Sequence, residues 1–137
     1  MFVFDARSIE LLAKTDNRLA TVMYMAIRRS QSPFRIVQSS RTIEQQLAYF
    51  AAGTSRVNPD DYDDLATLYR KAKHITGPGM PLSRAVDVAM SGRDPYDKTA
   101  LRNLSELVKG CAFIAKVEIR WGGDFTSIVD MPHFELA

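Results

Sequence analysis

The chain has 137 residues, of which 46% are hydrophobic and 25% are charged, and its net charge is +2 at neutral pH. This length and composition predict one soluble domain covering residues 1–137, with a core that needs no disulfide support. No apolar run of about 18 residues is present and Lys and Arg are scattered, so the composition argues against membrane insertion and nucleic-acid binding.

The N-terminus and the single cysteine give the expected cellular setting. The opening residues, MFVFDARSIELL, reach Asp5 without a basic segment or a sustained apolar segment, so no signal peptide is predicted and synthesis in the cytosol is expected. Cys111 has no partner for a disulfide or a metal knuckle. Its apolar helical context predicts a buried structural thiol rather than a nucleophile.

The first part of the chain has the pattern of helices around one strand. Apolar residues recur at helical spacing across 8–30, and the interruption TDN divides this segment into two helices, the second longer. Residues 34–40 are rich in β-forming side chains and predict a strand. Residues 42–53 predict a helix of about three turns, because the segment opens on a threonine with Gln45 three positions later and ends at a glycine.

The middle of the chain alternates loops with regular elements. Residues 54–64 predict an acidic loop and 63–73 a short helix that the aspartates cap, since the glycine and glutamate of a calcium-binding EF-hand loop are missing. The segment 77–83, rich in Gly and Pro, predicts a loop, and 84–90 alternates like a strand. Residues 94–116 predict a helix of about four or five turns.

Three short strands are predicted at the end of the chain, over 117–125, 127–131 and 133–136, with a Gly-Gly corner in the first. The order of elements requires these strands to join the earlier ones in one sheet. We therefore predict an α+β fold, in which a small, mainly antiparallel sheet has helices packed beside it.

Two histidines and one aspartate are candidates for a metal site at this sheet. His74 and His133 are the only histidines, and Asp87 lies between two valines in a predicted buried strand, where an unpaired carboxylate is unfavourable. Catalytic zinc usually takes three His, Asp or Glu ligands and keeps one position for water. The three residues can form such a site. The alternative is that the histidines are surface or hydrogen-bonded residues and that Arg or backbone amides satisfy Asp87.

Five segments resemble the motifs of one enzyme family. In chain order they are SSRTIEQQ at 39–46, HITG at 74–77, RAVD at 84–87, RWGGDF at 120–125 and DMPHFEL at 130–136. From about Phe34 to its end, the chain is similar to the zinc D-alanyl-D-alanine carboxypeptidase and L-alanyl-D-glutamate endopeptidase family, and especially to its small bacteriophage endolysins. That family has the motif SxHxxGxAxD and, later, an acidic residue three positions before a histidine.

The first motif departs from the family pattern in two ways. The family places its histidine seven residues before the aspartate, where this chain has Met80, so the resemblance requires residues 78–83 to be an insertion. Alignment without the insertion puts Met80 at the ligand position and predicts an impaired metal site. The serine expected two residues before the histidine is Ala72. The match of HITG and the loop composition of 78–83 favour the insertion.

The resemblance implies His74, Asp87 and His133 as zinc ligands and Asp130 as the catalytic carboxylate. Zinc lowers the pKa of bound water toward about 7, and a nearby carboxylate can take the water proton and pass it to the leaving amine. Considered without the resemblance, Asp130 caps a proline-containing turn. Arg41 either holds the polarised carbonyl oxygen or a substrate carboxylate, or it is a surface arginine.

Three further side chains near these motifs have less specific expectations. Glu135 either accepts a hydrogen bond from a ligand imidazole or points to solvent. Gln46 and Trp121 are expected to support the fold or line the cleft, and Trp121 equally suits the core.

The resemblance implies a zinc-dependent peptidase that hydrolyses the L-alanyl-D-glutamate bond of the peptidoglycan stem peptide. Release of terminal D-alanine is the alternative within the same class, and a non-catalytic cell-wall-binding module is the alternative outside it. The implied partner is the stem peptide and the expected state is a monomer. The endolysin resemblance also implies that the enzyme stays in the host cytoplasm until the membrane is breached.

Overall fold

Two helices open the chain, in agreement with the apolar spacing. The computed structural model, which describes residues 1–137, places α1 at Ala6–Leu12 and α2 at Asn17–Arg29. Each helix begins at an aspartate, because the carboxylates of Asp5 and Asp16 accept hydrogen bonds from backbone N–H groups of the first turn. These caps satisfy N–H groups that have no partner inside the helix.

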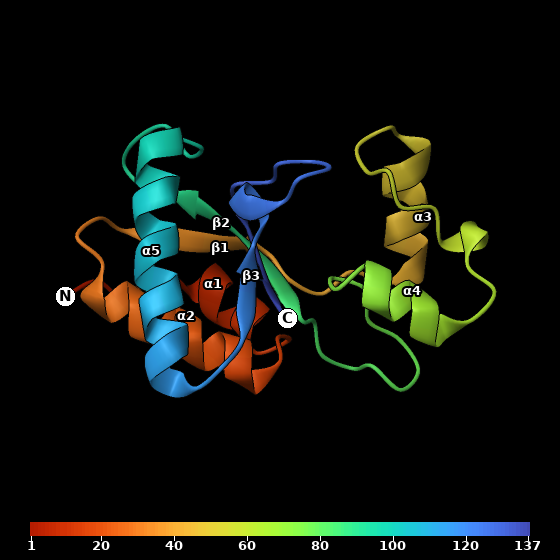
Figure 1. Ribbon diagram of the computed structural model, residues 1–137, viewed down its shortest axis with the longest axis horizontal. Coiled ribbons are helices and arrows are strands. Elements are labelled where there is room, and N and C mark those ends of the chain that lie inside the picture. The colour runs from red at the N-terminus through yellow and green to blue at the C-terminus, as the bar shows by residue number, and fades with distance from the viewer.

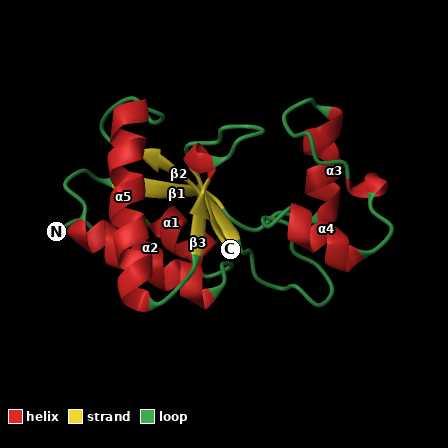
Figure 2. Cartoon of the chain, in the orientation of Figure 1, coloured by secondary structure: helices red, strands yellow, loops and turns green.

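Four strands form one antiparallel sheet in the order β1-β2-β4-β3 (Figure 1, Figure 2). The strands are β1 (Phe34–Gln38), β2 (Ala85–Met90), β3 (Ile119–Trp121) and β4 (His133–Leu136). β4, the last strand of the chain, lies between β2 and β3, so the terminal strands join the earlier ones as predicted. The α+β fold with a small antiparallel sheet is confirmed.

The strand predicted over 117–125 is shorter than expected. β3 ends at Trp121, because Gly122–Asp124 form the short 3-10 helix η2. The two glycines therefore turn the chain out of the sheet rather than forming a corner within a longer strand.

The strand predicted at 127–131 is wrong, since these residues form a loop. The N–H of Asp130 donates to the carbonyl of Gly122 at 2.9 Å, which bends the chain back toward η2 instead of leaving that N–H free for a sheet ladder. The apolar Ile128 and Val129, which suggested a strand, stay 46% and 62% exposed.

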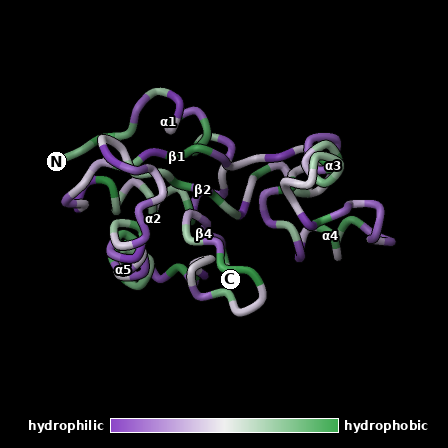
Figure 3. The backbone as a smooth tube through the Cα atoms, turned by 90° about the horizontal axis from the view of Figure 1, so that it is seen from above, coloured by the Kyte–Doolittle hydropathy of each residue, from purple (hydrophilic) through white to green (hydrophobic).

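The main hydrophobic core lies between the sheet and two helices. α2 and α5 (Lys98–Ala115) pack against each other and lie on the same side of the sheet (Figure 1, Figure 3). Val86, Val88 and Phe134 contribute fully buried side chains from the strands, and Cys111 of α5 is buried among them as predicted. None of the helices has the length and apolar content needed to span a bilayer.

A second group of helices stands apart from α2 and α5, to the right of the sheet in Figure 1. It consists of α3 (Ile43–Ala51), the 3-10 helix η1 (Pro59–Asp61) and α4 (Leu65–Lys71). α3 opens with the predicted capping box, formed by the side chains of Thr42 and Gln45. A small hydrophobic cluster holds this part together, and its buried members are Leu68, Tyr69 and Ile75.

The loop at 77–83 begins with a closed turn. The backbones of Gly77 and Met80 donate to each other, with N···O distances of 2.9 and 3.0 Å. Gly79 has a φ of +75°, which an L side chain rarely adopts. The turn is therefore a defined structure, and the hydroxyl of Tyr69 holds it by donating to the carbonyl of Pro78 at 2.8 Å.

Candidate metal centre

Asp87 and His133 face each other across β2 and β4, where they are direct register partners. Val86, Val88 and Phe134, their neighbours along the two strands, belong to the main core. Because side chains alternate along a strand, Asp87 and His133 lie on the opposite face of the sheet, which α2 and α5 do not cover. Two rigid strands thus present a carboxylate and an imidazole side by side.

His74 reaches the same place from the segment after α4. The N–H of Arg84 donates to the carbonyl of Lys73 at 2.9 Å, and the N–H of Arg41 donates to the carbonyl of His74 at 2.8 Å. The first of these bonds joins the two ends of the segment 73–84. His74 is therefore held next to the start of β2, the strand that carries Asp87.

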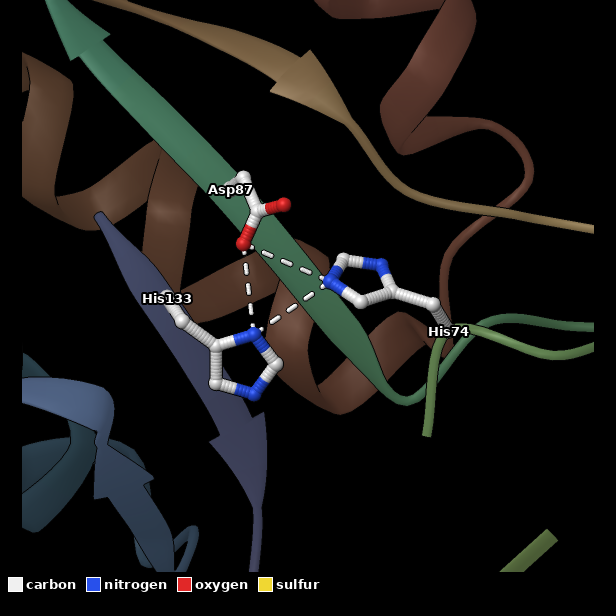
Figure 4. A group of neighbouring side chains, drawn as sticks. All are labelled: His74, Asp87 and His133. Carbon is white, nitrogen blue, oxygen red and sulfur yellow. Dashed lines mark hydrogen bonds and ion pairs between the residues drawn. The ribbon is translucent and has the colours of Figure 1, made fainter. Parts of the chain in front are cut away.

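Three side-chain atoms converge in a triangle (Figure 4). Nε2 of His74 lies 3.3 Å from both Oδ1 of Asp87 and Nδ1 of His133, and those last two atoms are 3.2 Å apart. Donors at ~2.0–2.1 Å from a tetrahedral zinc ion are roughly 3.3–3.4 Å apart. The triangle matches one face of such a tetrahedron, so the residues fit a metal ion. We call this group the His–Asp–His triangle.

The second nitrogen of each imidazole is already engaged. Nδ1 of His74 lies 2.7 Å from the carbonyl oxygen of Ser39, and Nε2 of His133 lies 2.8 Å from Oε1 of Glu135. Both oxygens are acceptors, so in the neutral rings the hydrogen sits on these nitrogens and the lone pair points into the triangle. Glu135 is held in turn by Nζ of Lys73 at 3.2 Å. It is thus a hydrogen-bond acceptor and does not point to solvent.

The bonds within the triangle shift the protonation of its members. Burial disfavours the ionised form of Asp87, but hydrogen bonds with His133 and His74 outweigh it and hold the pKa of Asp87 below its ordinary value. Burial likewise disfavours the charged form of His133, but hydrogen bonds with Asp87 and Glu135 outweigh it and raise the pKa of His133 to about 9. A metal ion that binds at neutral pH must displace this proton.

Asp130 lies just outside the triangle. Its Oδ2 is 3.9 Å from Nδ1 of His133, and its side chain is 49% exposed. Burial and the neighbouring charge of Asp87 raise the pKa of Asp130 above its ordinary value. A carboxylate in this position, beside the three donor atoms and open to solvent, is suited to exchange a proton with a water molecule.

The loop that carries Asp130 is fixed by the Trp-Gly-Gly segment. Nε1 of Trp121 donates to the carbonyl of Met131 at 2.7 Å. A Cβ added to Gly122 would lie 2.0 Å from the carbonyl oxygen of Asp130 and 2.9 Å from Cβ of His133. Only glycine allows this approach, so Gly122 sets the position of Asp130 relative to the triangle.

If Asp130 handles a proton as the resemblance implies, a Gly122→Ala substitution is expected to lower kcat by roughly 100-fold, because a displacement of about 1 Å of such a group has that effect. The rate of peptidoglycan digestion, the activity that the resemblance implies, measures it. Gly110→Ala is the matched control, because a Cβ at Gly110 meets nothing within 4 Å in the middle of α5. The control should keep full activity and gain about 0.5–1 kcal/mol of stability. Equal activity of the two variants would show that the approach at Gly122 has no role in catalysis.

Arg41 borders the site from the chain after β1. Its Nη1 donates to Oε1 of Gln46 at 2.8 Å, its Nη2 donates to Gln38, and its guanidinium lies 4.6 Å from the ring centre of Tyr49. Burial lowers the pKa of Arg41, and the charge of Asp87 acts in the opposite direction. Arg41 is thus a half-buried cation beside the triangle, and Gln46 supports it.

The fold brings all five predicted site residues to one place. His74, Asp87 and His133 form the triangle, with Asp130 and Arg41 next to it. Their chemical roles stay predictions.

The alternative alignment, which puts a methionine at the ligand position, does not agree with the fold. Met80 packs against the small cluster of the second helical group, and His74 lies at the triangle.

Two supporting residues were missed from the sequence. Ser39 holds His74 through its carbonyl, a backbone group that no residue type signals. Lys73 orients Glu135, and the only signal for it is a cation directly before His74.

Comparison with known proteins gives two matches. Residues 1–136 match the family described as phage L-alanyl-D-glutamate peptidase. Among solved structures, the fold is similar to the L-Ala D-Glu endopeptidase ChiX of Serratia marcescens, with a TM-score of 0.76 and 23% sequence identity over 98% of this chain and 90% of that chain. At this identity the likeness shows a shared fold. No curated protein sequence matches the chain.

Proposed function

This chain belongs to the phage L-alanyl-D-glutamate peptidase family, and we propose that it hydrolyses that bond in peptidoglycan stem peptides with a zinc ion held by His74, Asp87 and His133. The observation that carries the zinc assignment is the triangle, whose three donor atoms are spaced like ligands of one tetrahedral ion. Two imidazoles and one carboxylate are also a donor set that suits zinc.

The other residues act on protons and charge around this ion. Bound zinc supplies a Lewis acid that polarises a carbonyl and lowers the pKa of water toward about 7. Asp130 accepts the proton of the attacking water and donates it to the amine of D-glutamate as the amide bond breaks. Arg41, half-buried and cationic beside the triangle, stabilises negative charge on the substrate carbonyl or holds a substrate carboxylate.

The match to a phage family also suggests where the enzyme is made and where it acts. The enzyme acts as an endolysin, which is made in the host cytoplasm and reaches the cell wall once the membrane is opened. All five proposed site residues come from one chain, and we propose that the enzyme acts as a monomer.

Digestion of purified peptidoglycan, with identification of newly exposed amino termini, tests the proposed activity. New amino termini of D-glutamate support it, and their loss on zinc removal and return on zinc addition support the metal. Free D-alanine as the only product would instead make the chain a carboxypeptidase. Binding to the cell wall without either product would make it a binding module.

Zinc affinity is expected to rise about tenfold per pH unit from pH 6.5 to about 9. The pKa of His133 is raised to about 9 in the metal-free site, so below that pH one proton must leave His133 for each zinc ion bound. Asp87 has a lowered pKa and stays ionised over this range, so it contributes no slope. Competition with a chelator at pH 6.5, 7.5 and 8.5 measures the slope, and a flat profile would contradict the proton on His133.

A further inference from the structure

A hollow of about 1160 Å³ with a strong positive charge lies next to the triangle. Seven Lys and Arg side chains line it, with two carboxylate side chains, Asp124 and Glu135. Arg18, one of the seven, is paired with Asp16 at 3.0 Å, so the groove has an excess of four positive charges. The whole chain has an excess of only two. Cations that are scattered in the sequence therefore gather in this one place. We call it the basic groove.

Some of these cations are neutralised within the fold. Lys73 and Arg120 both approach Glu135, at 3.2 and 3.4 Å. Lys109 pairs with Asp124 at 2.8 Å. These pairs form the wall of the groove and account for both of its carboxylates.

Three cations of the groove have no carboxylate partner. Arg70 and Lys71, at the end of α4, are exposed and form no ion pair. Arg84 is partly buried, and its Nε and Nη2 atoms are inaccessible to solvent and have no hydrogen-bond partner. These two atoms are out of reach of a ligand in the groove, so Arg84 would act on an anion there through its charge and through its remaining nitrogen, Nη1.

The basic groove is connected to the triangle through shared side chains. Glu135, which lines the groove, accepts the hydrogen bond of His133. Phe125, also in the groove wall, has its ring 5.7 Å from the ring of His133 and 5.6 Å from the guanidinium of Arg120. The imidazole of His133 therefore contacts the wall of the groove and also belongs to the triangle.

We propose that the basic groove binds the carboxylates of the stem peptide on the D-glutamate side of the cleaved bond, with Arg70, Lys71 and Arg84 as the residues that recognise them. This inference rests on the proposed function, because it takes its substrate from there. D-glutamate keeps a free carboxylate after one of its two carboxyl groups has formed the next amide. Guanidinium groups match such a carboxylate in shape and charge.

The form of the groove favours a peptide over a phosphate polymer. A chain of phosphates is followed by cations spread along a stripe. Here the cations surround one hollow, and carboxylates inside the wall already neutralise several of them. The remaining positive charge suits a ligand with a few carboxylates, bound at the edge of a peptidase site.

The test uses a stem-peptide fragment that begins at D-glutamate, so that no scissile bond is present. The fragment is prepared with its free α-carboxylate and with that group as a carboxamide, and binding to the zinc-loaded protein is measured by calorimetry. We expect the acid to bind at least tenfold more tightly. In an Arg70→Gln/Lys71→Gln variant and in Arg84→Gln the difference should fall below about threefold, with zinc content unchanged. Arg70 and Lys71 are exposed, so the first variant should fold normally even if Arg84→Gln, at a partly buried residue, does not.

Arg28→Gln/Arg102→Gln is the matched control, because it removes two exposed cations that lie outside the groove. The control should keep the full preference for the acid. Equal binding of acid and amide to the unmodified protein would overturn the groove assignment even if digestion yields D-glutamate termini. A polyglycerol phosphate that binds at the groove cations, with no preference between the peptides, would also overturn it. A preference for the acid without any digestion would support the groove and reject the proposed peptidase.

Discussion

Asp130→Asn is expected to lose between about 100-fold and 10,000-fold in the rate of peptidoglycan digestion, the usual range for loss of a general acid–base group. The fold and the zinc content should not change. The Asp130 side chain is 49% exposed and lies outside the triangle, and the hydrogen bonds that fix the loop use its backbone, which asparagine retains. Initial rates, zinc analysis and thermal unfolding of the same sample separate these effects.

Asp63→Asn is the matched control for this variant. It makes the same chemical change at an exposed carboxylate that lies between η1 and α4, outside the triangle and the basic groove. The control should keep nearly full activity. If Asp130→Asn also stays active, Asp130 has only a turn-capping role and another group must handle the proton.

His74→Ala is expected to lower zinc affinity by more than about 100-fold, because it removes a proposed ligand. Loss of a residue that only orients a ligand lowers metal affinity less, by about 10–100-fold. Met80→Ala should leave zinc affinity unchanged, because Met80 packs with the second helical group and not at the triangle. Zinc titration of both variants against a chromophoric chelator measures the two affinities.

This pair of variants decides between the two alignments of the first motif. Zinc binding that depends on His74 alone supports residues 78–83 as an insertion. Zinc binding that survives His74→Ala but not Met80→Ala would support the ungapped alignment and contradict the triangle as the metal site. Thermal unfolding of the metal-free forms checks that neither substitution disrupts the fold.

The helices could be predicted because their signals are local, although α1 begins at Ala6, before the segment 8–30 in which the first helix was expected. The aspartates at the starts of α1 and α2 and the capping box of α3 satisfy backbone groups within a few residues. The strand wrongly predicted at 127–131 is prevented by a contact that is not local. Its apolar residues suit a strand, but a hydrogen bond from Asp130 to Gly122 takes the chain elsewhere, and that bond depends on a glycine eight residues earlier.

The site residues could be selected from the sequence, but not their arrangement. Asp87 and His133 are far apart in the chain and meet only because β4 inserts between β2 and β3. The basic groove was missed for a related reason. Its cations come from helices, strands and a loop that are separate in sequence, so the sequence alone presents them as scattered.

The backbone bond between Lys73 and Arg84 has a consequence for how such enzymes vary. The bond holds residues 73 and 84 together, and the turn from Gly77 to Met80 closes on its own hydrogen bonds. We therefore expect that the spacing between the histidine and the aspartate of the motif can change while the two side chains keep their places. Search patterns that fix this interval would miss chains built in this way. Gly79, which is exposed and has open space around it, is a suitable point at which to insert a tag or a targeting peptide.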